Sequence, residues 1–485
     1  MIQVKISSTW NQTAETLLIP ITKSGKPLAD IAPLSAFATD RLATIFEGKK
    51  NEVQMLFTEQ QNIFLLGIGD ETADAKTLTK AFRKLSHQHK EKLSGTIGLY
   101  LHHLDHAAQI TEYALNGLLL GTYQVGHYKT DNKQNHPLAA TDAQINIYTD
   151  ARTQNIERAA QKGIATAETQ MSIFGLVNAP ANKKTPQVLA KWASESAQKY
   201  GYRAEIWDKK KIEEVGLHGL LAVNRGSEDP AHFIIMEYEG VGARRKVGLV
   251  GKGVTFDTGG LSIKSANNMH LMKSDMGGAA AVLGTMELAT KLKLPVHLIG
   301  IVPTTDNSVD ALSIKPSDVI DTYSGKTIEI IDTDAEGRLI LSDGLNYMVR
   351  HFQPDVLIDL ATLTGSAVRA LGYHAAALFS NHEALAKALQ QAGEKTGEKV
   401  WQMPLWAEYF DDLKSDVADI KNLGGRPVAG AIAAAKFLEF FTEEHPCWAH
   451  LDIAGVAFND MEFSKGHSST AYGVRLLTEY LSSME

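Results

Sequence analysis

The sequence has very little cysteine and no long apolar segment. Cys447 is the only cysteine among 485 residues, so neither an intrachain disulfide nor a cysteine metal cluster can form, which fits a reducing compartment. No apolar run reaches the roughly 18 residues that a membrane-spanning helix needs. The first residues, MIQVKISSTWNQ, lack the charged and apolar regions of a secretion signal. We therefore expect a cytoplasmic protein that does not bind membranes.

Basic charge is also scarce. The chain carries 48 lysines and arginines against 56 acidic residues, for a formal net charge of −8, and both signs are interspersed. Nucleic-acid binders need concentrated basic residues, so we do not expect nucleic acid to be the main partner. The content of hydrophobic residues, 44 %, is ordinary for a folded globular protein. A chain of this length exceeds the size of a single core, and we expect two or three domains.

The pattern of apolar residues divides the chain into three parts. The first contains short apolar or alternating runs mixed with helical segments, which is typical of a small α/β domain. The second is polar and helical, as a linking helix would be. In the third, Thr185 and Pro186 indicate the start of a helix and Gly201 its end. The predicted parts are an N-terminal α/β domain (1–150), a linking helix (151–174) and a larger domain (175–485).

Strand-like runs alternate with helices through the larger domain. The expected strands are 204–207, 233–238, 247–250, 296–302, 328–331, 356–360 and 451–456, and the expected helices are 279–292, 338–352 and 431–441. Continuous apolar strands separated by helices predict a mostly parallel sheet with helices on both faces. The fold class is thus α/β. Ligands of such sheets bind beyond the carboxyl ends of the strands.

Two glycine-rich stretches concentrate charged side chains at such positions. Residues 251–275 read GKGVTFDTGGLSIKSANNMHLMKSD, and residues 332–339 read DTDAEGRL. Both follow expected strands at their carboxyl ends. Together they hold four carboxylates, two lysines and one arginine, which are Asp257, Asp275, Asp334, Glu336, Lys252, Lys264 and Arg338. This set of groups is typical of a hydrolase that uses two metal ions.

The first stretch fits neither of two common nucleotide-binding patterns. A phosphate-binding loop would require glycine at position 246 and serine or threonine at position 253, where the chain has Lys246 and Gly253. A dinucleotide fingerprint that starts at Gly251 would require glycine at position 256, where the chain has Phe256. The glycines instead let the backbone pack closely around a compact polar site. A tight turn with solvated charges is the alternative.

The second stretch brings acidic groups together if the chain stays extended after the expected strand at 328–331. Alternate residues then fall on one side, and Asp334 and Glu336 converge. Such carboxylates repel and raise one another's pKa unless cations lie between them, which a pair of divalent metal ions would satisfy. The alternative is an acidic start of the helix near Arg338, but it leaves the acidic groups upstream unexplained.

The formal charges of the groups agree with two metal ions. Four carboxylates contribute −4 and two divalent ions contribute +4, while one lysine would be a neutral amine ligand. Lys264 and Arg338 then leave an excess of +2. Such an excess suits the activation of a water molecule and the stabilisation of a developing oxyanion.

At these residues the sequence closely resembles the leucine aminopeptidase (cytosol aminopeptidase) family of two-metal exopeptidases. The likeness covers nearly all of 165–485 and is weaker over the first domain, where 112–129 matches best. Its motifs are VNAPAN (177–182), LAVNRGS (221–227), VGKGVTFDTGGLSIK, MKSDMGGAAAV, DTDAEGRL, DLATLTG (359–365), GGRPVAGAIAA (424–434) and WAHLDIAG (448–455). The resemblance implies a homohexameric leucyl aminopeptidase that removes amino-terminal residues, preferentially leucine and similar apolar ones, from peptides.

The resemblance also implies which residues hold the metals. Asp257 and Glu336 would bridge two ions. Lys252 and Asp275 would complete the shell of one ion, and Asp334 that of the other through its carboxylate and backbone carbonyl. A lysine ligand must be neutral, so metal affinity should weaken as the pH falls. Zinc or manganese is the expected metal, with magnesium and cobalt as alternatives.

Further residues are implied to act on the substrate. Lys264 would be the electrophile that faces the oxyanion, and Arg338 would hold a bicarbonate ion that shuttles the proton. The implied substrate-binding residues are Met272, Thr362, Leu363, Gly365 and Ala454. Core packing is the alternative for the apolar residues among them. His450 is expected to be a core histidine rather than a ligand.

Two departures from the family pattern and two rival functions remain. Asp332 stands where the family has asparagine, and SSTAYGVRLL (468–477) replaces a commoner glycine-rich pattern. A two-metal phosphoesterase would share the carboxylates but would not explain a lysine ligand. A binding or architectural protein without catalysis is not excluded by a fold alone. The presence of Lys252, Lys264 and Arg338 argues against a loss of catalytic activity.

Overall fold

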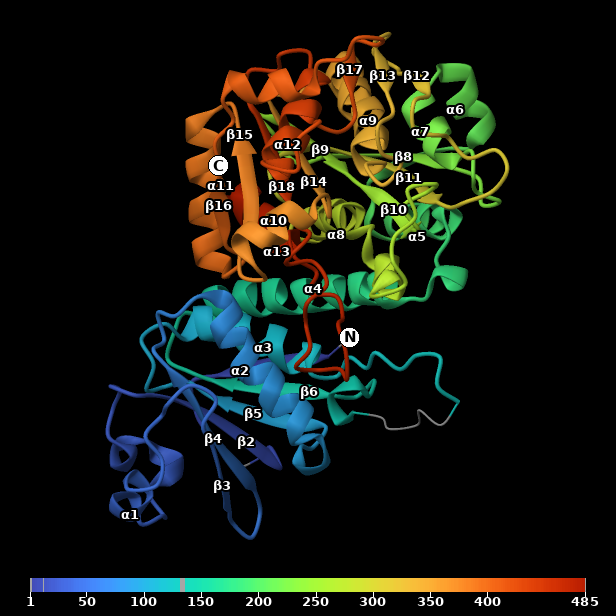
Figure 1. Cartoon of the computed structure of the whole chain (residues 1–485). Coiled ribbons are helices and arrows are strands. Elements are labelled where there is room, and N and C mark those ends of the chain that lie inside the picture. Colours follow the sequence, from blue (N-terminus) through green and yellow to red (C-terminus); the bar gives the residue numbers. More distant parts are fainter. Residues whose placement is uncertain (1, 12, 131–135, 485) are drawn as a thin grey trace. The chain divides into compact units, whose positions relative to one another are not determined.

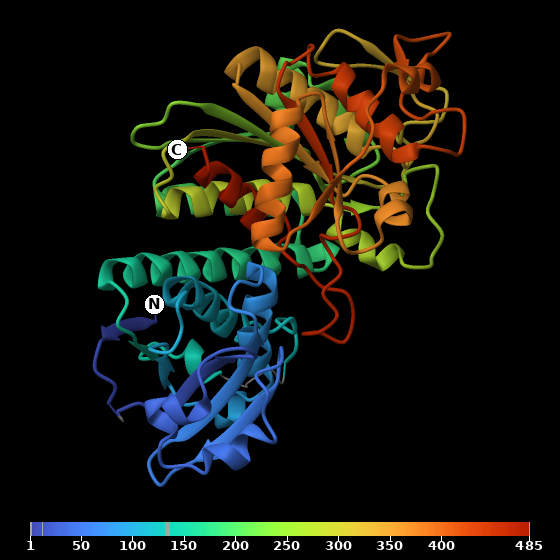
Figure 2. The same cartoon turned by 90° about the vertical axis from the view of Figure 1, so that its left-hand side faces the viewer.

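The computed structural model describes residues 2–11, 13–130 and 136–484 and forms two compact units. The first unit is Met1–Met171 and the second is Ser172–Glu485. Figure 1 and Figure 2 show each unit built around its own sheet. The division falls within α4 (Thr153–Asn178), which is 26 residues long. No helix among the described residues combines the length and the apolar character needed to cross a membrane.

The first unit contains a six-stranded sheet in the order β1-β6-β5-β2-β4-β3. The strands are β1 (Gln3–Ser7), β2 (Thr16–Thr22), β3 (Val53–Phe57), β4 (Asn62–Gly69), β5 (Thr96–Tyr100) and β6 (Gln144–Tyr148). All neighbours are parallel except β3 and β4. The helices are α1 (Thr39–Ala43), α2 (Ala75–Gln88) and α3 (Ala107–Leu120). Apolar or alternating runs at 3–6, 17–21, 53–57 and 63–68 and a helical pattern at 75–85 predict the first four strands and α2 from the sequence, whereas β5 and β6 are not predicted.

The second unit contains a nine-stranded sheet in the order β16-β15-β18-β14-β9-β11-β8-β7, with β10 paired to β11. The strands are β7 (Arg203–Trp207), β8 (His232–Glu239), β9 (Lys246–Gly251), β10 (Gly253–Asp257), β11 (His297–Asn307), β14 (Val356–Ala361), β15 (Ala376–Ser380), β16 (Val400–Gln402) and β18 (Trp448–Asp452). The central strands β18, β14, β9, β11 and β10 are parallel, while β15–β18, β11–β8 and β8–β7 are antiparallel pairs. The predicted mostly parallel sheet is confirmed.

Helices cover both faces of this sheet. They are α5 (Pro186–Tyr200), α6 (Lys209–Val215), α7 (His218–Asn224), α8 (Gly277–Lys291), α9 (Gly337–Phe352), α10 (Gly365–Leu371), α11 (Glu383–Thr396), α12 (Gly430–Phe440) and α13 (Val474–Ser482). Side chains alternate between the faces along β9. A Cβ at Gly248 would contact Met348 of α9, whereas one at Gly251 would contact the Gly278 carbonyl of α8. Helix α8, which follows Asp275, and helix α9, which contains Arg338, therefore lie on opposite faces.

The predicted boundaries of α5 are confirmed. Pro186 is its first residue, Thr185 is its N-cap, and Gly201 ends it in the left-handed conformation at φ 86°. Proline suits the first turn because it lacks an N–H that would otherwise stay unpaired, and glycine adopts a positive φ without a Cβ clash.

Two predicted strands differ from the structure. The last strand is β18 (Trp448–Asp452), which begins and ends earlier than the predicted 451–456. The strand predicted at 328–331 is β13 (Thr327–Glu329), and it belongs to a separate three-stranded sheet. That sheet also contains β12 (Val319–Asp321) and β17 (Ile420–Lys421). DTDAEGRL therefore follows a strand of the small sheet rather than the central one.

The chain also does not stay extended through DTDAEGRL. The Asp332 Oδ1 accepts a hydrogen bond from the Asp334 backbone N–H at 2.8 Å, which closes a turn. Glu336 then has helical backbone angles, φ −76° and ψ −37°, and is the N-cap of α9. The expected alternation of residues on one side of an extended chain was therefore wrong. The turn brings Asp334 and Glu336 together instead.

Asp343 anchors α9 to its neighbours. This fully buried carboxylate accepts hydrogen bonds from the Leu220 N–H of α7 and from the Tyr323 N–H, both at 2.9 Å. Burial raises its pKa from the ordinary 3.8 to about 7, against the lowering effect of its N–H donors. The position of α9 matters because Arg338 lies in its first turn.

The free energy of unfolding should depend on pH through the Asp343 carboxylate. Because its pKa is raised in the folded state, Asp343 contributes stability that is fully present below its ordinary pKa and is lost as the pH rises through about 7. Asp343→Asn does not titrate and loses one acceptor, so it should be the less stable protein at pH 6. We expect the difference in unfolding free energy to shrink by about 1 kcal/mol between pH 6 and pH 8 in urea titrations. A difference that does not vary with pH would contradict this assignment.

Candidate metal centre

Lys252 is held at the centre of the main sheet by its own backbone. It lies between β9 and β10, where its N–H donates to the Leu360 carbonyl of β14 at 3.0 Å. Its carbonyl accepts from the Ala279 N–H of α8 at 2.8 Å. The short parallel strand β10 was not predicted, and it continues from this point to Asp257. Lys252 is thus fixed immediately before β10, and Asp257 at its end.

The amine of Lys252 lies between two carboxylates. Its Nζ is 2.7 Å from Asp275 Oδ2 and 2.7 Å from Glu336 Oε1, and it donates to the Thr362 carbonyl at 3.2 Å. The side chain is buried, which by itself lowers its pKa, but the surrounding carboxylates outweigh burial and raise that pKa. Gly337 makes room for it, since a Cβ there would lie 2.7 Å from the amine.

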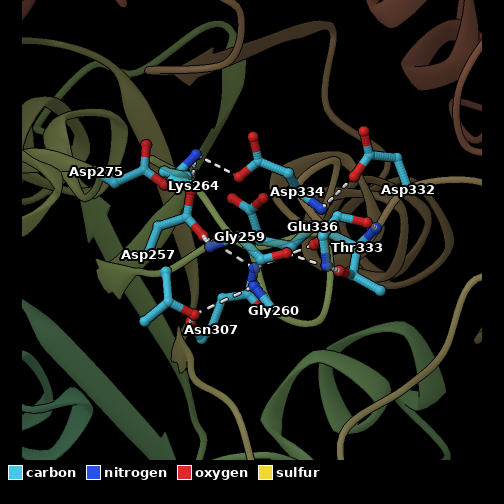
Figure 3. A network of polar contacts seen from close by, with 12 residues as sticks. Asp257, Gly259, Gly260, Lys264, Asp275, Asn307, Asp332, Thr333, Asp334 and Glu336 are labelled. Atoms are coloured by element: carbon cyan, nitrogen blue, oxygen red, sulfur yellow. Dashed lines mark hydrogen bonds and ion pairs between the residues drawn. The ribbon is translucent and has the colours of Figure 1, made fainter. Parts of the chain in front are cut away.

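Lys264 lies between the other two carboxylates. Its Nζ is 2.7 Å from Asp257 Oδ2, and it also pairs with Asp334 Oδ1. The turn before it depends on Gly259, which has φ 89° and would place a Cβ only 3.0 Å from Asp334 Oδ1. A larger residue would meet both the backbone strain and this contact. Figure 3 shows the Lys264 ammonium between Asp257 and Asp334.

The acidic side chains predicted from the sequence converge. Oxygen atoms of Asp257, Asp334 and Glu336 all lie within 4.8 Å of one another, and Asp275 joins them through Lys252. Four carboxylates and two lysine ammonium groups give a formal charge of −2. Burial, reinforced by neighbouring carboxylates, raises the pKa of Asp275 and raises that of Asp334 to about 7. The site therefore favours additional positive charge.

The donor set fits divalent cations. Asp275 Oδ2 and Glu336 Oε1 are buried, and each lies 2.7 Å from the Lys252 amine, which occupies only one lone pair of each oxygen. Carboxylate oxygens and an amine nitrogen are accepted by zinc, manganese, magnesium and cobalt. Buried oxygens with free lone pairs are the ligands that such ions require.

Arg338 lies beside the acidic cluster in the first turn of α9. It is buried, and its Nη1 donates to the Asn422 carbonyl at 2.7 Å. Its guanidinium also lies over the ring of Phe437, at 6.0 Å from the centroid. Burial lowers its pKa to about 10, so it is charged at neutral pH. Within the described part of the chain its Nε has no hydrogen-bond partner, so the group can still bind an anion.

Two residues that sequence reasoning missed join the two acidic stretches. Asn307 Nδ2 donates to Asp257 Oδ1 at 2.9 Å and to the Thr333 carbonyl at 3.1 Å. Thr333 Oγ1 donates to the Gly259 carbonyl at 2.6 Å (Figure 3). Asn307 ends β11 as the register partner of Asp257 on β10. Since β10 was not predicted, the sequence pattern gave no reason to pair these two residues.

Two of the predicted substrate-binding residues lie beside Asp275. Thr362 Oγ1 donates to Asp275 Oδ1 at 2.7 Å, and the Thr362 carbonyl accepts from Lys252. Met272 lies in a short 3₁₀ helix (Met269–Ser274) that leads into Asp275, whose N–H donates to the Met272 carbonyl at 3.2 Å. Both side chains are half-buried. The Thr362 side chain thus contacts the acidic cluster, whereas Met272 is joined to Asp275 through the backbone.

The other three predicted substrate-binding residues lie in loops that are connected by the buried Asp452. Asp452 Oδ1 accepts from the Leu363 N–H at 3.1 Å and from the Ala454 N–H at 3.2 Å. Its Oδ2 accepts from the Thr364 hydroxyl at 2.7 Å, immediately before Gly365 at the start of α10. The loops that carry Leu363, Gly365 and Ala454 are therefore held together. Asp452 was not singled out from the sequence.

His450 does not belong to the cluster. It is fully buried, and its Nδ1 lies 2.6 Å from Asp359 Oδ1, while Trp448 Nε1 donates to Asp359 Oδ2 at 2.8 Å. The expectation that His450 is a core histidine is confirmed.

Comparison with known proteins identifies the family. The sequence model described as "Cytosol aminopeptidase family, catalytic domain" matches residues 174–478, and that of the N-terminal domain matches 43–132. A probable cytosol aminopeptidase of Chloroherpeton thalassium is 41 % identical over 493 residues, covering 96 % of each chain. One of Chlorobaculum parvum is 48 % identical over 380 residues, covering 76 % of this chain and 75 % of the relative.

Solved structures agree with these matches. A tomato leucine aminopeptidase mutant superposes with a TM-score of 0.88 at 30 % identity, covering 100 % of this chain and 97 % of the other. The bottromycin maturation enzyme BotP in complex with Mn superposes with a TM-score of 0.85 at 31 % identity, covering 97 % and 100 %. With the acidic cluster described above, these findings place the chain in the cytosol aminopeptidase family of metal-dependent aminopeptidases.

Proposed function

We propose that the chain is a leucyl aminopeptidase that removes leucine and similar apolar residues from the amino terminus of peptides. The convergence of Asp257, Asp334 and Glu336 beside Lys252 and Asp275 carries this proposal. The similarity to a leucine aminopeptidase of tomato supports the preference for leucine.

The proposed metal ligands follow from this convergence. Asp257 and Glu336 would bridge two divalent ions. Lys252, as a neutral amine, and Asp275 would complete one shell, and Asp334 would complete the other through its carboxylate and backbone carbonyl. When bound, the ions would polarise the scissile carbonyl and lower the pKa of an attacking water. Zinc or manganese is the proposed metal, and the manganese complex of BotP supports manganese.

Lys264 is the proposed electrophile. Its ammonium lies beside Asp257, which would bridge the two ions, and beside Asp334, which would bind one of them. A lysine is protonated at neutral pH at its ordinary pKa, so it can donate a hydrogen bond to the oxygen on which negative charge develops. Its side chain is 22 % exposed, so it remains accessible from solvent.

Arg338 is the proposed anion-binding residue. The buried guanidinium has an Nε without a partner among the described residues, beside the acidic turn. A planar oxyanion such as bicarbonate can pair with two N–H groups of one guanidinium. The bicarbonate would supply the base that accepts the proton from the water, a role for which the cluster provides no histidine.

The substrate and assembly proposals rest on the same residues and on the family. Met272, Thr362, Leu363, Gly365 and Ala454 would form the substrate pocket beside Asp275. The chain would act on peptides as a homohexamer in the cytoplasm. The relatives' name, cytosol aminopeptidase, supports the proposed compartment. The domain limits at 1–150, 151–174 and 175–485 stay predictions.

Removal of the metals should abolish peptidase activity. We expect hydrolysis of leucine p-nitroanilide to be lost after chelation and to return on addition of manganese or zinc, because the carboxylate cluster alone provides no water activation. A phosphate ester assayed in parallel distinguishes the rival phosphoesterase. Peptidase activity that resists chelation would contradict the proposal, and phosphatase activity alone would favour the rival.

Substitution of Lys264 should affect turnover more than metal content. Because its ammonium would stabilise only the charge that develops during the reaction, Lys264→Ala should lower kcat about 100- to 1000-fold. The amount of bound metal, measured by elemental analysis after dialysis, should stay near that of the wild type. Lys264→Arg, which keeps the charge, is the control and should retain more activity. Loss of the metals in Lys264→Ala would show that the residue serves metal binding instead.

Substitution of Arg338 should remove a response to bicarbonate. In buffer depleted of carbonate, the wild type should be slow and should gain activity when bicarbonate is added. Arg338→Ala should be slow at every bicarbonate concentration, with kcat lowered about 100-fold or more. Arg338→Lys keeps the charge without the planar pair of donors and should respond only weakly. An unchanged response in Arg338→Ala would refute the anion-binding role.

A further inference from the structure

Asn422 touches both the acidic turn and Arg338. It follows β17 of the small sheet and is fully buried. None of its backbone or side-chain groups points into the acidic cluster as a ligand, and the sequence pattern did not mark it. Its hydrogen bonds nevertheless concentrate on the segment that carries the proposed ligands.

The side chain of Asn422 holds the backbone of the turn. Its Oδ1 accepts from the Ile331 N–H at 2.8 Å and from the Asp332 N–H at 3.3 Å. Its Nδ2 donates to the Asp332 carbonyl at 2.6 Å and to the Ala335 carbonyl at 3.5 Å. An amide can pair with N–H and C=O groups at the same time, so one side chain spans both sides of the turn.

The backbone of Asn422 holds two further points. Its N–H donates to the Glu329 carbonyl at 3.0 Å, which continues the pairing of β17 with β13. Its carbonyl accepts from Arg338 Nη1 at 2.7 Å. The position of the guanidinium therefore depends on where residue 422 lies, and that position is fixed by the turn and by the small sheet.

We propose that Asn422 is a positioning residue that fixes the metal-ligand turn at 331–336 and the Arg338 guanidinium relative to each other. The inference rests on the proposed roles of Asp334, Glu336 and Arg338. The turn leaves the small sheet, whereas Lys252 and Asp257 come from the central one. Ligands that come from two sheets can bind the same ions only if the distance between them is fixed. Asn422 contributes to this by holding the ligand-bearing turn against the small sheet.

The experiment compares metal affinity in four proteins. Wild type, Asn422→Ala, Asn422→Asp and Asn346→Ala are stripped with a chelator and titrated with Mn²⁺ by calorimetry. Asn346 is the matched control, because it is a buried asparagine of α9 whose Nδ2 donates to Glu443 Oε1 at 3.1 Å, away from the cluster. Thermal unfolding of each protein measures the general loss of stability, and kcat and KM are measured on leucine p-nitroanilide.

We expect Asn422→Ala to bind Mn²⁺ about 10- to 100-fold more weakly, as loss of a residue that orients metal ligands does. Its kcat should fall with a smaller change in KM. Asn422→Asp keeps the acceptor for two N–H groups but puts a carboxylate oxygen against the Asp332 carbonyl, so it should be impaired at least as much. Asn346→Ala should lose thermal stability but bind Mn²⁺ as the wild type does.

Two results would overturn the inference. One is wild-type Mn²⁺ affinity and kcat in a folded Asn422→Ala protein. The other is an equal loss of affinity in Asn422→Ala and Asn346→Ala, which would reflect general destabilisation. If Asn422→Ala does not fold, the comparison of Asn422→Asp with Asn346→Ala decides. A wild type that binds two Mn²⁺ ions but does not hydrolyse peptides would contradict the proposed function, while the affinities would still test Asn422.

Discussion

Repulsion between buried carboxylates is the constraint on which the arrangement of this chain depends. Asp257, Asp275 and Glu336 are brought together with little exposure to water, where uncompensated negative charge is costly, and the half-buried Asp334 lies beside them. Only nearby positive charge makes such a cluster tolerable. Two lysines provide part of that charge, and the formal deficit that they leave equals the charge of one divalent ion. If Lys252 is a neutral amine, the uncompensated negative charge is larger, and it can be balanced by a second divalent ion.

Glycines and the small second sheet allow the charged side chains of this cluster to pack closely together. Gly337 leaves space for the Lys252 amine, and Gly259 lets the backbone turn beneath Asp334. The ligands come from two sheets, and Asn307 connects the strand that carries Asp257 to the turn at Thr333. Because the side chain of Asn307 is a neutral amide, it connects the two segments without adding charge to the cluster.

Much of the fold and the chemistry of the site could be predicted from the sequence. Apolar runs indicated the central strands, and Thr185, Pro186 and Gly201 set the ends of α5 because caps depend on local conformation. The charged residues were found because their types and glycine neighbours are informative by themselves. β10 was missed, since a strand of five residues between glycines and a polar turn has no distinct period. The extended course of DTDAEGRL was wrong because Asp332 closes a turn by a side-chain hydrogen bond.

The residues that were not predicted share one property. Asn307, Asn422 and Asp452 bind backbone groups of segments distant in the sequence, and each is buried. A buried amide or carboxylate of this kind is selected by the position of donors and acceptors around it, which exists only after the fold has formed. Catalytic residue types can be recognised one by one, whereas a positioning residue is defined by its partners. The sequence therefore gives the chemistry of a site more readily than its geometry, and the geometry decides whether that chemistry operates.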